Sequence, residues 1–552
     1  MRTTVFSIAL LSWGGICAQE YLDAPRFPDL AYFKRHFAER PADSQLGLVT
    51  RAGEFLVNGT LELSMRSYLE LVISNNTDIQ IQRLSIEPGR NAITRAFAPF
   101  DASVVASVQA SQSNTPSYSA LEGAQRLSQF REPVRFLFQQ TLESGAEYNV
   151  GFEASKFSSN NRFAIFNPVL NANITFGFTQ PLLRNRGRYV NRLPILIART
   201  QYNVSRFALE HQLNRILEDA QNAYWTVVQA RENLRVQERS LESLSAVLKR
   251  HKRELELGEI APVDIYESEQ AHAARELSVT EARHRLEQAE NELRRSMAID
   301  LHPTFQNVPI VLTEPLSPAQ QQVFDREEWV RLALQKRPDL KASDLVLSVD
   351  DMLFRQSKNA LLPDVSINAA YTSAGRGGQF IQRSQVFGSD DAVGQIVRTI
   401  PGGLGDALTQ LFGFGFPTYS FALTARLPIR DRRAAADLAD ATVSKRLNTL
   451  RIRAIQQQIR LDVLNAVSRI ERSRATLRLA QTSVDIAKSR VEAEQLKYTR
   501  GVTTIFFLLD AQTSLTEAEA DLVDRSVQYQ RDLARLHSAA ATSLANFGIV
   551  TQ

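Results

Sequence analysis

Two glycines are each followed, nine residues later, by a carboxylic acid, and these acids are the clearest chemical groups of the chain. Gly258 precedes Glu267 and Gly501 precedes Asp510, while Asp264 lies inside the first of these intervals. Carboxylates that converge in a narrow space bind cations. Acids at the start of a helix are also stabilised by the helix macrodipole, so a purely structural role stays open.

Patterns typical of catalysis and metal binding are missing from the sequence. There is no Gly-x-x-x-x-Gly-Lys-Ser/Thr phosphate loop and no Gly-x-Ser-x-Gly nucleophile turn. The single cysteine, Cys17, excludes a disulfide framework, a cysteine-ligated zinc site and an iron–sulfur cluster. The seven histidines form no His-Glu-x-x-His pair, and we expect most of them at solvated helix positions. The sequence therefore predicts no enzyme, no cofactor and no metal centre.

Composition narrows the class of protein further. The net charge of the 552 residues is only +4, which argues against a nucleic-acid-binding surface spread over the chain. The hydrophobic share of 44% and the charged share of 22% are those of a folded chain. No segment after residue 18 contains eighteen consecutive apolar residues, so a bundle of membrane helices is not expected.

Residues 1–18 have the pattern of a secretory signal peptide. A positive start is followed by an almost wholly apolar run and by small residues up to Ala18. The apolar run is too short to span a bilayer core of about 30 Å. Cys17 leaves lipoprotein cleavage open as an alternative, although Ile16 stands where that pattern wants a small residue. Either way, we expect the mature chain outside the cytoplasm.

An internal repeat of roughly 240 residues organises the rest of the chain. Besides the two glycine turns, residues 75–79 match 336–340, and residues 180–183 match 427–429. Three matches in the same order predict a duplicated domain, each copy running helix, two strands, long helix, turn and helix. The expected organisation is a signal peptide (1–18), an N-terminal segment (19–60), repeat one (61–300), a linker (301–325) and repeat two (326–548).

Each repeat is expected to contain a very long helix. Apolar residues recur at steps of four and three from Leu209 to Leu248 and again from Ile452 to Val491, which is coiled-coil spacing. A helix from Arg188 to Glu256 would extend roughly 100 Å at 1.5 Å per residue. A helix of this length does not fit within a compact soluble domain.

Four segments of about nine residues alternate with period two, as strands do. They are Ser103–Ser111, Asn171–Thr179, Val365–Thr372 and Thr418–Leu427. Strands of this length suit a tilted crossing of a bilayer, although a soluble sheet with one wet face alternates in the same way. For a membrane sheet, we expect Phe176, Phe178, Tyr419 and Phe421 to face lipid, and Asn173, Thr175, Thr418 and Ser420 to face the lumen.

Residues between these strands are expected to form long extracellular loops at 112–147 and 373–417, the second with an irregular glycine-rich end. Residues 148–155 also alternate and are expected to extend a hairpin. Four strands cannot close a barrel in lipid, because the sheet edges would be left unpaired. Two copies would give eight strands, and three would give twelve with room for a channel.

This order of elements, given twice after a signal peptide, resembles that of the TolC-like outer-membrane efflux proteins, over about residues 61–548. The motifs of the resemblance are residues 61–99, 179–184 and 332–363, and the glycine turns. The resemblance implies an α+β fold: a trimeric twelve-stranded outer-membrane β-barrel continued by a long α-helical coiled-coil barrel in the periplasm. It also implies passive export of small molecules or proteins, type I secretion included, with an inner-membrane transporter and a periplasmic adaptor.

The resemblance also implies roles for residues near the turns. Relatives narrow the periplasmic entrance with acids six and nine residues after the second glycine. Asp510 matches the second of these positions, and Phe507 stands at the first, where it would offer an apolar constriction instead. The two turns, at Gly258 and Gly501, would contact the adaptor.

Relatives tie neighbouring helix pairs together by a tyrosine before the second glycine and an acid after the first, which match Tyr498 and Asp264. An arginine expected in this lock is Thr503 here, and Arg500 is a candidate substitute. The alternative to a channel is a structural coiled-coil protein of the periplasm or cell surface, with soluble sheets at one end. Release from membranes by salt or alkali without detergent would favour that alternative.

Overall fold

The computed structural model describes residues 52–118, 123–258, 262–316, 324–384 and 394–547. The chain divides into two units, Met1–Thr50 and Arg51–Gln552. The first unit lies outside the described residues, and with it the predicted signal peptide and most of the predicted N-terminal segment.

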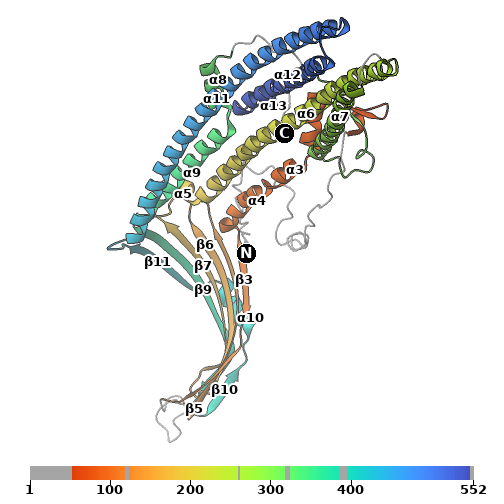
Figure 1. Ribbon diagram of the computed structural model, residues 1–552. Helices are drawn as coiled ribbons and strands as arrows, with labels where there is room; N and C mark the ends of the chain where they lie inside the picture. The colour runs from red at the N-terminus through yellow and green to blue at the C-terminus, as the bar shows by residue number, and fades with distance from the viewer. Residues whose placement is uncertain (1–51, 119–122, 259–261, 317–323, 385–393, 548–552) are drawn as a thin grey trace, which may run out of the picture. The chain divides into compact units, whose positions relative to one another are not determined.

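Four long helices lie together in this unit (Figure 1). They are α6 (Leu193–Glu256), α7 (Pro262–Ser296), α11 (Arg432–Thr499) and α12 (Ile505–Ala539). Helix α6 contacts α7 and α12, and α11 contacts α12. The two predicted coiled-coil segments are confirmed as the helices α6 and α11, which have 64 and 68 residues and therefore extend roughly 100 Å each.

Shorter helices precede the strands in both halves of the chain. They are α2 (Met65–Asn75), α3 (Thr77–Leu84), α4 (Glu87–Ala96), α8 (Arg326–Lys336) and α9 (Pro338–Ala360). Val330 and Ala333 of α8 are buried against α11 and α12, so this contact is part of an apolar core. The remaining short elements are η1 (Ala52–Phe55), β1 (Leu56–Val57), β2 (Thr60–Leu63), η2 (Ala98–Phe100), α5 (Arg188–Asn191), β8 (Ile310–Leu312) and α13 (Ser543–Asn546).

The segments matched at 75–79 and 336–340 are both junctions between two helices. The Asn76 side chain accepts hydrogen bonds from the backbone N–H groups of Asp78 and Ile79, at 2.9 and 3.1 Å, and so caps α3. Arg337 ends α8 because the proline that follows disfavours helical geometry at this residue. Its guanidinium bonds Asp339 of α9 and Asp462 of α11. No helix among the described residues is both long and apolar enough to cross a bilayer.

Strands β1, β2 and β8 form a small sheet of their own, and the other eight described strands form one large antiparallel sheet. They are β3 (Ser103–Val108), β4 (Ser111–Pro116), β5 (Arg126–Thr141), β6 (Glu147–Ser159), β7 (Phe166–Pro181), β9 (Asp364–Arg383), β10 (Ile396–Ile400) and β11 (Phe416–Arg426). The order is β10-β9-β7-β6-β5-β3, with β11 also on β9 and β4 also on β5. Each edge is therefore two strands laid end to end, and the sheet is six strands wide.

The expectation of four strands, two in each repeat, is wrong. The additional hairpin is β5 and β6, much of it in the segment 112–147 that was expected to be a loop. Charges in β5 interrupt its apolar alternation, which hid the strand, but they pair across the hairpin. Arg135 lies 2.8 Å from Glu153, and Lys156 lies 3.4 Å from Glu132, so strand pairing satisfies them.

The segment 373–417 is not a loop throughout either. Strand β9 continues to Arg383, β10 follows, and the glycine-rich end contains the helix α10 (Leu404–Phe412). This helix packs on the sheet because Gly375 has no side chain: a Cβ atom there would lie 1.9 Å from the carbonyl oxygen of Ala407. Ala407 and Leu411 are fully buried in this contact.

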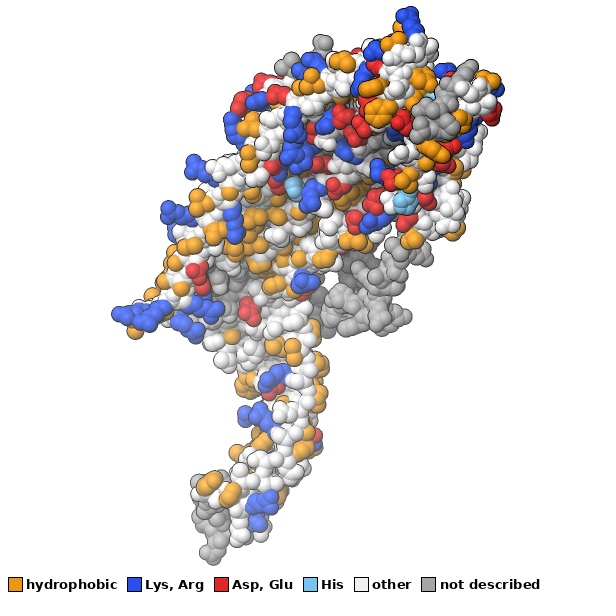
Figure 2. Space-filling view, viewed as in Figure 1, with side chains coloured by type: hydrophobic (Ala, Val, Ile, Leu, Met, Phe, Trp, Pro, Cys, Tyr) orange, Lys and Arg blue, Asp and Glu red, His pale blue; other side chains and the backbone are white. Residues whose placement is uncertain are grey.

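The sheet has one apolar and one polar face. Phe176, Tyr371 and Tyr419 lie in register across three strands, so they share a face. Thr175 and Thr372 lie in register on the opposite face, where their hydroxyl oxygens are 3.1 Å apart. The predicted alternation of β7, β9 and β11 is confirmed; which face meets lipid stays a prediction. Charged side chains crowd over the helices and are sparser over the strands (Figure 2).

Candidate functional site at the helix tip

Both predicted glycine turns connect antiparallel helices. Gly258 ends α6 with φ +71°, and Gly501 ends α11 with φ +69°. A Cβ atom at either position would meet nothing within 4 Å, so glycine is favoured there by the left-handed backbone and not by a lack of space. We call the ends of α6, α7, α11 and α12 next to these turns the helix tip. Residues 259–261 of the first turn lie outside the described residues.

An apolar core joins the α6–α7 pair to the α11–α12 pair at the tip. Ile505, Leu508 and Leu509 of α12 are buried against Leu244 of α6. Val247, Ala271 and Tyr498, from α6, α7 and α11, pack against the same cluster. All four helices therefore contribute to one core, so a separation of the pairs would expose it.

His251 of α6 lies beside this core with only 1% of its surface exposed. Its Nε2 atom is 2.8 Å from the Tyr498 hydroxyl oxygen on α11, and its Nδ1 atom is 2.6 Å from the Ser268 hydroxyl oxygen on α7. A neutral imidazole has one donor and one acceptor, and each hydroxyl can play either part. One ring thus connects three helices. A carboxylate oxygen of Glu254 lies 4.0 Å from Nε2.

The expectation that most histidines are solvated fails at one described position. Among the described histidines, His284 is exposed, His211, His272, His302 and His537 are partly buried, and only His251 is buried. A signal for His251 was present in the sequence: the residue continues the four-and-three spacing of the apolar seam after Leu244 and Leu248. A histidine at a seam position must be buried and must find hydrogen-bond partners.

The predicted lock residues lie near the tip, and the structure describes some of their contacts. The backbone of Asp264 is in α7, but its side chain lies outside the described residues. Thr503 is partly buried in the turn before α12. Arg500 is exposed; its backbone N–H bonds the carbonyl oxygens of Leu496 and Lys497, and its guanidinium has no ion pair within the described part of the chain.

The two predicted constriction residues, Phe507 and Asp510, are both exposed on α12. The Phe507 side chain is 51% exposed, and its ring packs edge to face on Phe506, with 5.6 Å between the ring centroids. Asp510 differs from the expected unpaired acid, because its Oδ2 atom lies 2.6 Å from Nη2 of Arg490. The sequence did not single out Phe506 or Arg490; Arg490 is twenty residues from Asp510 in the chain and lies on another helix.

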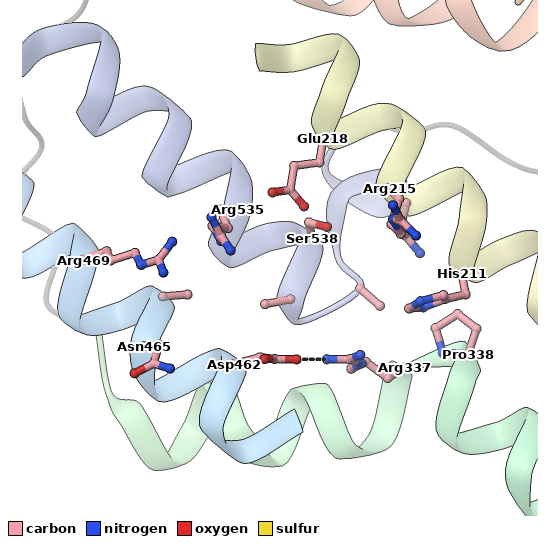
Figure 3. Close-up of a pocket in the computed structure, with 14 residues that line it drawn as sticks. His211, Arg215, Glu218, Arg337, Pro338, Asp462, Asn465, Arg469, Arg535 and Ser538 are labelled. Carbon is pink, nitrogen blue, oxygen red and sulfur yellow. Dashed lines mark hydrogen bonds and ion pairs between the residues drawn. The ribbon is translucent and has the colours of Figure 1, made fainter. Parts of the chain in front are cut away.

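A cavity of about 320 Å³ lies farther along the helices, between α6, α9, α11 and α12 (Figure 3). Arginines outnumber acids in its lining, which contains Arg215, Arg337, Arg469, Arg535, Glu218 and Asp462. Burial opposes the charge of Arg337, but its bonds to two aspartates hold its pKa above the ordinary value. Burial lowers the pKa of His211 at the rim. No nucleophile and base are paired among these lining residues.

Comparisons with known proteins agree with this geometry. Residues 329–542 match the family model described as "Outer membrane efflux protein". No curated protein matches the chain. The solved structures that match include the CmeC outer membrane channel of Campylobacter jejuni, which is 13% identical with a TM-score of 0.59, over 87% of this chain and 86% of that one.

Two further structures have the same fold. The open state of the MtrE outer membrane channel of Neisseria gonorrhoeae is 16% identical with a TM-score of 0.57, over 87% of this chain and 89% of that one. A membrane protein from Pseudomonas aeruginosa is 17% identical with a TM-score of 0.59, over 91% of this chain and 96% of that one. The match over residues 329–542 and the shared fold make this chain similar to outer membrane efflux proteins.

Proposed function

We propose that three copies of this chain form a passive channel-tunnel, which exports small molecules or proteins across the outer membrane. An inner-membrane transporter and a periplasmic adaptor supply the energy and the connection. The observation that carries this proposal is the two-faced sheet joined directly to long paired helices. Its apolar face suits lipid, and its polar face suits a water-filled lumen.

In this proposal the helix tip is the closed periplasmic end. Phe507 and the Asp510–Arg490 pair line the constriction, because they are exposed on the helices that leave the second turn. The turns at Gly258 and Gly501 are the contacts for the adaptor.

The contact that keeps this end closed is the hydrogen bond between Tyr498 and His251, which joins α11 to α6. The resemblance to TolC-like proteins implies Asp264 of α7 as a second partner for Tyr498, and Arg500 and Thr503 flank the second glycine turn. Loss of the tyrosine hydroxyl removes a bond between the helix pairs while keeping the ring that packs on the tip core. The tip should then open more readily.

Single-channel recording in planar bilayers tests the gate. Tyr498→Phe alone, and more strongly Tyr498→Phe with Asp264→Ala, should raise the conductance of the purified protein. His272→Ala is the matched control, because His272 bonds Ser245 between α6 and α7 and does not link the two pairs in the described contacts. Conductance unchanged by the tyrosine substitution would place the gate elsewhere.

The wild-type protein tests whether the chain forms a channel at all. A protein that forms no channels, and that salt or alkali releases from membranes without detergent, would be the structural coiled-coil protein instead. A protein that needs detergent for release and forms channels supports the proposal.

A further inference from the structure

The strand count of the sheet bears on the size of the channel. Six strands lie side by side in the order β3, β5, β6, β7, β9 and β10, with β4 and β11 extending the two edge strands. We propose that three copies close an eighteen-stranded barrel, six strands from each, in place of the twelve strands that the family resemblance implies. This inference rests on the proposed trimeric channel.

The additional hairpin is a full member of the sheet. Strands β5 and β6 pair without a break from Gln129 with Ser159 to Thr141 with Glu147, and β6 pairs with β7 over most of its length. A hairpin that merely covered a barrel from outside would leave β3 to pair with β7. Here β3 pairs with β5, and two strands separate it from β7.

The hairpin also continues both faces of the sheet. Phe152 lies in register with Phe136 on one side and with Ile174 on the other, so the apolar face is continuous. On the opposite face, Glu153 lies in register with Asn173 and forms its ion pair with Arg135. A charged pair is costly in the lipid core and acceptable in a lumen, so the Arg135–Glu153 pair gives the hairpin the orientation that a barrel wall requires. The other pair, Glu132 with Lys156, shares the apolar face and lies three residues from the open end of the hairpin.

The two edges of the sheet are suited to pair with each other in neighbouring copies. Nearly every residue of β3, β4, β10 and β11 is exposed in the single chain, and such edges cannot face lipid unpaired. Strands alternate in direction across the sheet, and six is an even number. The first strand of one copy is therefore antiparallel to the last strand of the next, and the barrel closes without a mismatch.

The consequence is a wider outer-membrane channel. Barrel diameter grows roughly linearly with strand number, so eighteen strands give a barrel about 1.5 times as wide as twelve, in the range of porins with an open aqueous channel. The narrow point for passage then lies in the helical part and not in the barrel. Charged pairs such as Arg135 with Glu153 line the added wall.

Disulfide scanning in membranes tests the strand order, in a Cys17→Ser background. Val105→Cys in β3 is combined with cysteine at one lumen-face position of β7 or β11 at a time. The positions are Asn173 and Thr175 in β7, and Thr418, Ser420, Ala422 and Thr424 in β11. Val105→Cys with Leu137→Cys is the positive control, because these residues are in register in adjacent strands.

We expect disulfides between chains from β3 to β11, and none from β3 to β7. Disulfides within one chain from β3 to β7 would mean that the hairpin lies outside a twelve-stranded barrel, and would overturn this inference while the trimer stands. A native mass measurement on the same samples shows whether three chains assemble. A lone chain with no disulfides between chains would overturn the proposed channel together with the inference.

Discussion

At the scale of single residues, the candidate gate depends on pairs of side chains from different helices. Asp510 is about half exposed, and so is Arg490, which holds it in an ion pair. Three such pairs around a channel axis would carry much less net charge than three unpaired carboxylates. The strong cation preference expected of an acid ring is therefore weakened by residues of the same chain.

Removal of the Arg490 charge and removal of the Asp510 charge should change ion selectivity in opposite directions. Arg490→Gln leaves the carboxylates unpaired and should increase the preference for cations, whereas Asp510→Asn leaves the guanidinium and should reduce it. Reversal potentials in a potassium chloride gradient measure both. Arg490→Lys keeps the charge and is the control, and folding stability should change by less than about 1 kcal/mol, because the pair is exposed. Identical selectivity in all three variants would show that the constriction lies elsewhere.

At the scale of elements, the end of α12 is attached to α8 through a histidine. The His537 ring packs edge to face on Trp329, with 5.4 Å between the ring centroids. Its Nδ1 atom lies 2.8 Å from the amide nitrogen of Asn546, which can only donate, so this ring nitrogen accepts the bond. Burial lowers the pKa of His537, because the protonated ring would lose solvation.

This contact should make stability depend on pH. The unfolded chain takes up a proton on this histidine near the ordinary pKa of about 6.5, whereas the folded chain takes it up only at lower pH. The contribution of His537 to stability is therefore fully present above about pH 6.5 and is lost as the pH falls from there towards the folded pKa. The total loss is about 1.4 kcal/mol for each unit by which folding lowers the pKa. Thermal unfolding at pH 7.5 and 5.0, followed by tryptophan fluorescence, measures the loss.

His537→Gln should reduce the difference between the two pH values. His284→Gln is the matched control, because His284 is exposed on α7. An equal pH dependence in the wild type and in His537→Gln would show that other groups dominate, among them His211, whose pKa burial also lowers.

The packing of α10 on the sheet leads to a second prediction at the scale of elements. Gly375→Val would place side-chain atoms where the backbone of α10 lies, and overpacking of this kind costs about 1–3 kcal/mol. We expect faster proteolysis within residues 400–415. Gly405→Ala, on α10 itself, meets nothing within 4 Å and should leave the helix in place. Equal protection of Gly375→Val and the wild type would contradict the packing described above.

At the scale of the whole molecule, the two faces of the sheet decide how the protein lies in the membrane. Phe421 is 80% exposed, and its neighbour Ser420 points to the opposite face. Phe421→Arg should cost about 2–4 kcal/mol of stability if the residue lies near the bilayer midplane, whereas Ser420→Arg should cost far less. Urea unfolding in lipid vesicles measures both, and equal losses would refute the assignment of the faces.

The sequence by itself determined the elements with a strong local signal. Coiled-coil spacing predicted α6 and α11, because a repeat of 3.5 residues sustained over many turns has no other good structural solution. The glycines at 258 and 501 predicted the two turns, because a left-handed residue at a helix end favours glycine. Alternation in residues 171–179 and 418–427 gave the correct faces of β7 and β11.

Tertiary structure decided what depends on partners distant in the chain. Strand β5 was hidden because its charges are satisfied only across the hairpin, as Arg135 is by Glu153. The glycine-rich segment forms α10 because Gly375, about thirty residues earlier in the sequence, leaves room for a helix backbone. The seam spacing indicated that His251 is buried, but its hydrogen-bond partners on α7 and α11, like the pairing of Asp510 with Arg490, depend on how the helices pack.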